Sequence, residues 1–229
     1  MKRTRTDGRS ASSRAETDGR SASSRAGAAP AGHMALLQAA REEFAERGYD
    51  GTSIRQIAQR AGMSLSVLYH YYPGKTELLQ AIVDEAMDAY FGACEAALAE
   101  ADDDPVRRLA ALVTATIRFR AAYPSKGSLI QGEEHAFNEE FLSHYRKRAA
   151  QGTRMFSDVV EAGLASGAFR TPYPEDARRA VIAMCNAVGE WYDPRGALSV
   201  DEIAQRYVAL ALTVLECRPA ARTRALRPS

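Results

Sequence analysis

Long hydrophobic runs, paired cysteines and a large net charge are all missing from this chain. No run approaches the roughly 18 apolar residues of a membrane span, and the N-terminus lacks the apolar core of a signal peptide. Cys94, Cys185 and Cys217 are far apart and form no CxxC pair, so they predict neither a disulfide framework nor a zinc site, but buried small apolar residues in a reducing cytoplasm. A formal charge of +1 means that any nucleic-acid binding must come from a local patch.

Large apolar residues are also absent from the first 33 positions, which contain no Leu, Ile, Val, Phe, Tyr or Trp and repeat TDGRSASSRA at 6–15 and 17–26. Because such a segment has nothing to bury, we expect residues 1–33 to be a disordered low-complexity tail. Its seven basic residues against three acidic ones would suit an arm that follows DNA phosphates. The alternative, which we favour, is a solvated tail or sequence upstream of a start at Met34.

From Met34 onward the spacing of apolar residues predicts an all-α chain, without a convincing alternating strand. The 229 residues are enough for one domain plus a small second one, with a substantial core. After three N-terminal helices, further helices are expected over residues 76–99, 105–123, 139–165, 175–191 and 200–217.

The most specific pattern is residues 52–79, TSIRQIAQRAGMSLSVLYHYYPGKTELL. Thr52 is expected to cap a short helix that Gly62 ends. Ser64 would cap a second helix, with Leu68 on its apolar side. Two short helices joined by a tight glycine-containing turn form the DNA-reading unit of many repressors, in which the second helix enters the major groove.

Together with LLQAAREEFAERGYDG at 36–51, this segment resembles the N-terminal domain of the TetR, or tetracycline-repressor-like, transcriptional regulators. The resemblance implies a homodimer of all-helical, two-domain chains. A three-helix helix-turn-helix domain would occupy residues 34–80, a ligand-binding and dimerisation domain residues 81–218, and a flexible tail residues 219–229. The chain departs from the family at Glu43, where an apolar residue is usual, and we expect looser packing of the first helix there.

The residues expected to contact DNA lie at the starts and on the outer faces of the two short helices. Backbone N–H groups and hydroxyls at a helix start suit a phosphate. The second helix contains no Arg, Asn or Gln, so base reading should depend on thymine methyl groups, DNA shape and phosphate positioning. The resemblance implies that Lys75 binds a phosphate, and that Tyr69 and His70 reach the backbone or a base. The full set is Thr52, Ser53, Arg55, Ser64, Leu65, Ser66, Val67, Tyr69, His70 and Lys75.

Aromatic residues accumulate between positions 90 and 191. At helical spacing they are core residues by default, but the resemblance implies an inducer pocket in this region. The ending EWYDPRGALSVDEIAQRYVALAL at 190–212 is similar to family members that are associated with lipid catabolism and sense acyl-CoA thioesters. Basic residues at 118, 120 and 146–148 would either meet CoA phosphates or, more simply, form solvated helix faces. The candidate pocket residues are Tyr90, Phe91, Phe119, Tyr123, Phe137, Phe141, Tyr145, Phe156 and Trp191.

Two apolar stripes run along the last predicted helix. One stripe, with Ile203, Tyr207, Leu210 and Val214, is enough to cover the chain's own core, so the other should face a partner. The preceding helix offers small residues that allow close approach, which predicts a four-helix interface across a two-fold axis. The alternative is a monomer with both stripes internal. The expected interface residues are Ala180, Ala183, Ala187, Ala204, Val208, Ala211 and Leu215.

Catalysis has weak support in the sequence. Glu133, Glu134 and His135, with His144 nearby, could be imagined as a metal or acid–base site, but no further ligand, nucleophile or glycine-rich loop accompanies them. We therefore predict no enzyme and no cofactor. The expected function is a transcriptional repressor that a small apolar or acyl-CoA-type ligand releases from a palindromic DNA operator. The alternative is a helical protein-interaction module that uses the same fold without DNA.

Overall fold

The computed structural model describes residues 31–123 and 137–218, and these contain helices and no strand. The all-α prediction is confirmed, and the longest helix has the bounds that the sequence predicts. The helices are α1 (Ala31–Arg47), α2 (Ile54–Arg60), α3 (Leu65–Tyr71), α4 (Lys75–Glu100), α5 (Pro105–Ala122), α6 (Glu139–Ala165), α7 (Pro174–Trp191) and α8 (Val200–Val214).

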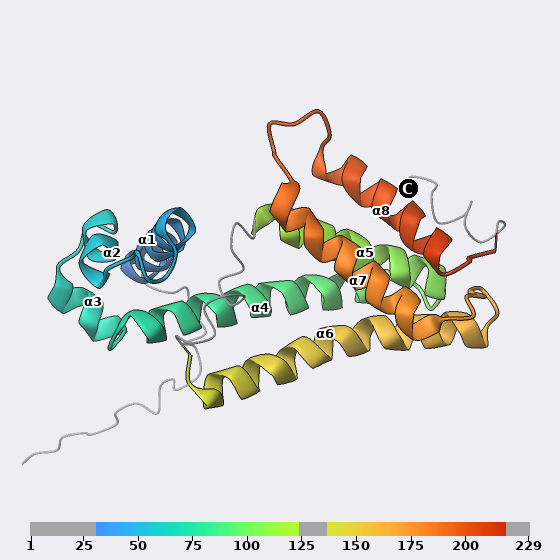
Figure 1. The fold of residues 1–229 in the computed structure, drawn as a ribbon, viewed down its shortest axis with the longest axis horizontal. Coiled ribbons are helices and arrows are strands. Elements are labelled where there is room, and N and C mark those ends of the chain that lie inside the picture. Colours follow the sequence, from blue (N-terminus) through green and yellow to red (C-terminus); the bar gives the residue numbers. More distant parts are fainter. Residues whose placement is uncertain (1–30, 124–136, 219–229) are drawn as a thin grey trace, which may run out of the picture.

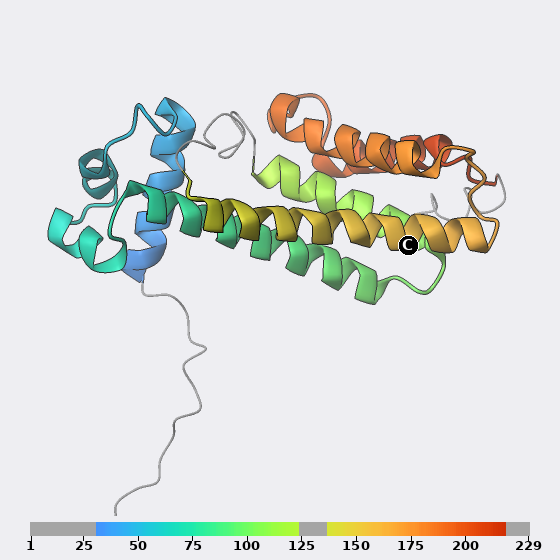
Figure 2. The same cartoon turned by 60° about the horizontal axis from the view of Figure 1, so that its bottom comes forward.

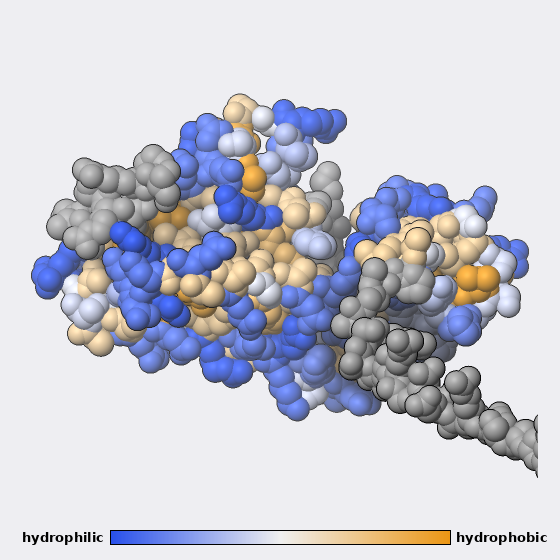
Figure 3. Space-filling model, turned by 180° about the vertical axis from the view of Figure 1, so that it is seen from behind, coloured by the Kyte–Doolittle hydropathy of each residue, from blue (hydrophilic) through white to orange (hydrophobic). Residues whose placement is uncertain are grey.

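Helices α1–α3 form a small body at one end of an elongated molecule, and α5, α7 and α8 pack together in a larger one (Figure 1). α4 runs from the small body into the larger one, with α6 lying along it (Figure 2). Seen from behind, the smaller body stands apart from the larger one as a separate lobe (Figure 3).

Side-chain caps explain where most of these helices begin. Ser53 and Ser199 each form a capping box, in which the serine hydroxyl accepts from the backbone N–H three residues on and that residue's side chain accepts from the serine N–H. Ser64, Asp104 and Asn138 accept backbone N–H bonds at the starts of α3, α5 and α6. Such caps satisfy N–H groups that the helix itself leaves unpaired.

Two hydrophobic cores correspond to the two bodies. The core of the small body joins α1–α3 to the first half of α4, and Phe137 and Phe141 at the start of α6 also belong to it. The core of the larger body surrounds α5, which buries Leu109, Leu112 and Val113 completely. Because α4 and α6 contribute to both cores, they couple the two bodies mechanically.

The start of α1 lies slightly before the predicted domain boundary. Ala31–His33 are helical, and the His33 Nε2 atom lies 2.7 Å from the Tyr72 hydroxyl. The His33 ring also stacks on Tyr72, with the ring centres 5.7 Å apart. These contacts attach α1 to the residue that follows α3. The rest of the predicted N-terminal tail and the tail from 219 lie outside the described residues.

Candidate nucleic-acid interface

The outer face of α3 is rich in exposed side chains. Leu68 is the only residue of this helix that is buried, and it anchors the helix to the small body's core. Ser66 and His70 are exposed, as are Val67 and Tyr69, whose exposed fractions are 45% and 50%. A short helix held by one buried leucine can present several side chains to a groove.

The turn between α2 and α3 has the geometry that the sequence predicts. Gly62 has a φ of +67°, in the left-handed region that favours glycine. Its N–H donates to the Gln59 carbonyl at 3.1 Å, and the Met63 N–H donates to the Ala58 carbonyl at 3.0 Å. Leu65 is half-buried at the start of α3, in contact with the core, so part of its surface is used for packing.

The prediction that Thr52 caps α2 is wrong, because Ser53 is the cap. Thr52 is 3% exposed, and its hydroxyl donates to the carbonyls of Glu43 at 3.0 Å and Gly48 at 2.7 Å. Its hydroxyl therefore bonds the end of the α1–α2 turn to the last part of α1 and to the start of the turn, and it points away from solvent. Ser53 and Arg55, in contrast, are exposed at the start of α2.

Lys75 has internal partners that the sequence did not indicate. Its ammonium donates to the backbone carbonyls of Tyr49 at 2.7 Å and Thr52 at 3.0 Å, and it lies 3.9 Å from the centre of the Tyr49 ring. The Tyr49 hydroxyl lies 2.7 Å from Thr76 Oγ1. Lys75 thus joins the start of α4 to the α1–α2 turn. An ammonium has three donors, so a phosphate contact would be additional to this positioning role.

The predicted pocket residues do not gather in one place. Tyr90, Phe119 and Tyr123 form one group on α4 and α5, with ring centres 5.1 Å apart for Tyr90–Phe119 and 4.7 Å for Phe119–Tyr123. Phe91 lies beside Tyr90 at 5.3 Å. This is the largest part of the predicted set that the structure brings together.

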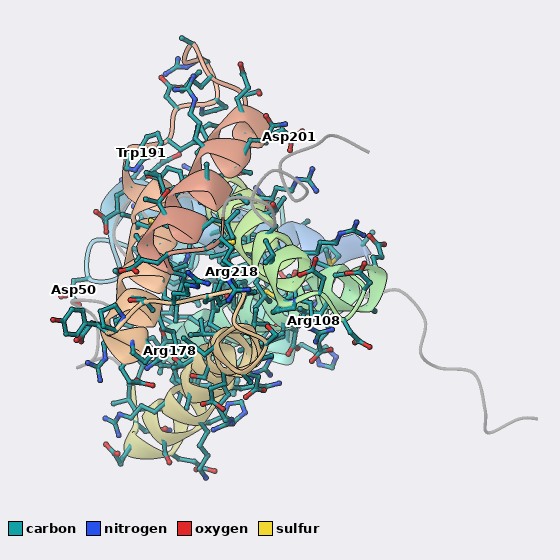
Figure 4. The ribbon with its side chains drawn as sticks, turned by 90° about the vertical axis from the view of Figure 1, so that its right-hand side faces the viewer. Asp50, Arg108, Arg178, Trp191, Asp201 and Arg218 are labelled. Atoms are coloured by element: carbon teal, nitrogen blue, oxygen red, sulfur yellow. The ribbon has the colours of Figure 1, made fainter. Side chains whose placement is uncertain are left out.

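The other predicted pocket residues serve different parts of the fold. Phe137 and Phe141 are buried in the small body's core, with Tyr145 packed against it, because the start of α6 reaches that body. Phe156 belongs to the core of the larger body. Trp191 is 50% exposed, on the outer side of α7 near the loop to α8 (Figure 4).

Most of the basic residues considered for CoA phosphates are paired within the chain. Arg118 Nε donates to Asp201 at 3.0 Å and Arg120 Nε donates to Asn186 at 3.0 Å. Arg146 contacts Glu139 at 2.7 Å, and Arg148 contacts Asp88 at 2.7 Å. These contacts favour the solvated-face interpretation that the sequence left open.

The structure corrects which apolar residues of α8 face outward. Ala204, Val208, Ala211 and Leu215, predicted as the interface, are at most 5% exposed and belong to the chain's own core. Leu210 and Val214 are 50% and 37% exposed instead. Ile203 of the first stripe is buried in the same core, so only the C-terminal part of that stripe faces outward. On α7, Ala180 and Ala183 are exposed and Ala187 is half-buried.

Two of the three cysteines are buried. Burial raises the pKa of the Cys94 thiol and raises that of Cys185 to about 12, so both stay protonated as buried small residues. No three His, Cys, Asp or Glu side chains in the described part of the chain are grouped as metal ligands; Glu133, Glu134 and His135 lie outside it. Across residues 31–123 and 137–218, no helix has the length and apolar character needed to cross a bilayer.

Sequence reasoning missed a cluster of charges between α1 and α2. The Glu43 carboxylate is buried and contacts Arg60 and Arg47 at 2.7 and 3.0 Å. The expectation that Glu43 loosens the packing of α1 is therefore replaced by an ion-paired contact. A signal was present, because a buried acidic residue needs a basic partner, but Arg60 could be identified only once the two helices were placed together.

Comparison with known proteins gives matches over both bodies. Residues 36–82 match the family described as bacterial regulatory proteins, tetR family, and residues 102–215 match the tetracyclin repressor-like C-terminal domain. The HTH-type transcriptional repressor KstR2 of Rhodococcus jostii is 30% identical over 179 residues, which cover 77% of this chain and 87% of that protein.

Solved structures extend the similarity to the whole fold. The ketosteroid transcriptional regulator KstR2 of Mycobacterium tuberculosis has a TM-score of 0.70 and 27% identity, over 78% of this chain and 91% of that one. AibR, solved in complex with isovaleryl coenzyme A and operator DNA, has a TM-score of 0.68 and 26% identity, over 78% of this chain and 97% of that one.

Proposed function

We infer the function from the premise that this chain belongs to the tetR family of bacterial regulatory proteins. It is a DNA-binding transcriptional repressor, with a helix-turn-helix domain in α1–α3 and a helical C-terminal domain. The DNA contacts, the ligand class, the dimer interface and the absence of catalysis are our proposals.

The observation that carries the DNA-binding proposal is the outer face of α3. Val67, Tyr69 and His70 are exposed there, next to Ser66 and the capping residue Ser64. The helix enters the major groove with its N-terminal residues toward base edges, and Val67 contacts a thymine methyl. Ser53 and Arg55 at the start of α2 contact a phosphate.

Selection of duplexes from a random pool, followed by fluorescence anisotropy, tests this proposal. A palindromic site is expected, because a two-fold dimer reads two half-sites about one helical turn apart. The affinity should fall steeply with salt, since phosphate contacts release counterions. If no duplex is enriched and no salt-dependent binding appears, the protein-interaction alternative replaces the DNA proposal.

The proposed ligand is an acyl-CoA-type thioester or another small apolar molecule. Support comes from the aromatic group of Tyr90, Phe91, Phe119 and Tyr123, which brings α4 and α5 together. Further support is the similarity to AibR, whose structure holds isovaleryl coenzyme A. α4 enters both cores, so a ligand beside it would change the position of α3 through a population shift.

Thermal denaturation with a series of acyl-CoA chain lengths tests the ligand class. A ligand bound only by the folded state raises the apparent melting temperature, and the same ligand should weaken operator binding by reciprocal linkage. Ketosteroids are tested in parallel, because the ketosteroid transcriptional regulator KstR2 is also similar to this chain. If only ketosteroids shift the melting temperature, the thioester proposal is replaced.

The proposed dimer uses the exposed faces of α7 and α8. Leu210 and Val214 of α8 are exposed apolar residues, and Ala180 and Ala183 of α7 are small and exposed. Burial of these side chains against a second copy would give a four-helix interface. As a DNA-binding repressor, the protein would act in the cytoplasm. Sedimentation at micromolar concentration tests the dimer.

A further inference from the structure

Glu43 is a charged residue on the inner side of α1, at a position where burial is costly unless the charge is paired. It is 4% exposed. Its Oε1 atom lies 2.7 Å from Arg60 Nε, and its Oε2 atom lies 3.0 Å from Arg47 Nε. Oε1 thus lies against the guanidinium of Arg60, which belongs to a different helix, whereas Oε2 is within ion-pair distance of Arg47 but accepts no hydrogen bond.

Arg60 is the last residue of α2, and its guanidinium faces three carboxylates of α1. In addition to Glu43, its Nη1 and Nη2 atoms donate to the two oxygens of Glu46 at 2.8 and 2.6 Å. Nη1 also lies 3.3 Å from Glu42 Oε2. A guanidinium donates in a fixed planar arrangement, so several simultaneous contacts restrict its orientation.

Both ends of α2 are thus attached to the same residue of α1. At the start, the Thr52 hydroxyl donates to the Glu43 backbone carbonyl at 3.0 Å. At the end, Arg60 contacts the Glu43 carboxylate. Gly62, which turns the chain into α3, follows Arg60 by two residues. The direction of α3 therefore depends on where Arg60 is held.

We propose that the Glu43–Arg60 ion pair is a positioning device for operator binding, which sets the angle of α2 and α3 on α1. Stability alone does not account for the pair, since well-packed apolar residues usually stabilise a buried site as well as an ion pair does. What the ion pair adds is direction, because an Arg–carboxylate contact has a preferred geometry. The inference rests on the proposed operator binding and concerns residues outside the expected DNA contacts.

The decisive variant replaces both charges with apolar residues, Glu43→Leu with Arg60→Leu, in the full chain. Its melting temperature should equal or exceed that of the parent, while its operator Kd should rise about tenfold. Its salt slope should match the parent's, because no phosphate contact is removed. The matched control is Arg107→Gln, which breaks an exposed ion pair with Asp102 in the larger body and should leave the Kd unchanged.

Arg60→Lys keeps the proposal testable if the double variant does not fold. Lysine retains the charge but not the forked geometry, so the Kd should rise while the melting temperature stays near that of the parent. Parent-like Kd values in either folded variant would overturn the inference. A reduced salt slope would also overturn it, since Arg60 would then touch a phosphate directly. Absence of DNA binding by the parent itself would instead refute the proposed function.

Discussion

Lys75 donates a hydrogen bond of 2.7 Å to the Tyr49 carbonyl and places its ammonium 3.9 Å from the centre of the Tyr49 ring. This contact joins the first residue of α4 to the turn between α1 and α2. α4 is also the helix that enters the core of the larger body. The Lys75–Tyr49 contact therefore lies where a movement of α4 would reach the DNA-binding helices.

Substitution of Lys75 by Met should separate its two roles. Loss of two charge-assisted hydrogen bonds and a cation–π contact should lower the unfolding free energy by about 1–3 kcal/mol. Loss of a phosphate contact should lower the salt slope of operator binding by about one per half-site. Denaturant titration and anisotropy at several salt concentrations measure the two effects. An unchanged slope with lowered stability would mean that Lys75 only positions α4.

His70→Ala and Tyr69→Ala should weaken operator binding by about 1–3 kcal/mol each. Both side chains are exposed in the free protein, so the melting temperature should change little. The control is Leu68→Ala on the same helix, which removes a fully buried side chain and should cost about 2–5 kcal/mol of stability. Parent-like affinity in both exposed variants would show that this face of α3 does not contact DNA.

The contacts of Arg60 with the carboxylates of α1 should make the stability of the small body sensitive to acid. The hydrogen bond from Arg60 holds the pKa of Glu46 below its ordinary value of 4.5. A carboxylate whose pKa is lower in the folded state than in the unfolded state stabilises the fold. This stabilisation is complete above the unfolded-state pKa and is lost as the pH falls through the folded-state pKa. The stability difference between the parent and Glu46→Gln should therefore be constant near neutral pH and shrink below about pH 4.5. Urea titrations across this range measure it, and a difference that persists in strong acid would contradict the assignment.

Leu210→Glu should prevent dimerisation, whereas Val208→Glu should prevent folding, although the two residues lie close together on α8. Leu210 is exposed, so a charge there should give folded monomers that lose operator binding, because a single half-site holds the protein too weakly. Val208 belongs to the core of the larger body, so a charge there should unfold that body. Sedimentation and circular dichroism distinguish the outcomes. A Leu210→Glu dimer of parental affinity would exclude this interface.

Local signals in the sequence predicted much of the fold. Ser64, Ser199 and Asp104 precede apolar periodic segments, and each caps a helix in the structure. Gly62 requires a left-handed backbone that few other residues adopt. Such signals act within a few residues, so they can be read without knowing the tertiary contacts. The family resemblance, carried by the spacing of the same segments, is confirmed by the matches over both bodies.

By itself, the sequence determined the helices, the Ser64 cap of α3 and the helix-turn-helix unit, because these depend on neighbours along the chain. Tertiary structure alone decided which apolar residues of α8 are buried, since Val208 and Leu210 are both apolar and only the packing of α8 against its neighbours distinguishes their positions. It also decided that the Glu43 charge is paired by Arg60 and that Lys75 bonds to the α1–α2 turn. In each case the partner comes from another part of the chain, and only the packing of the helices brings the interacting groups together.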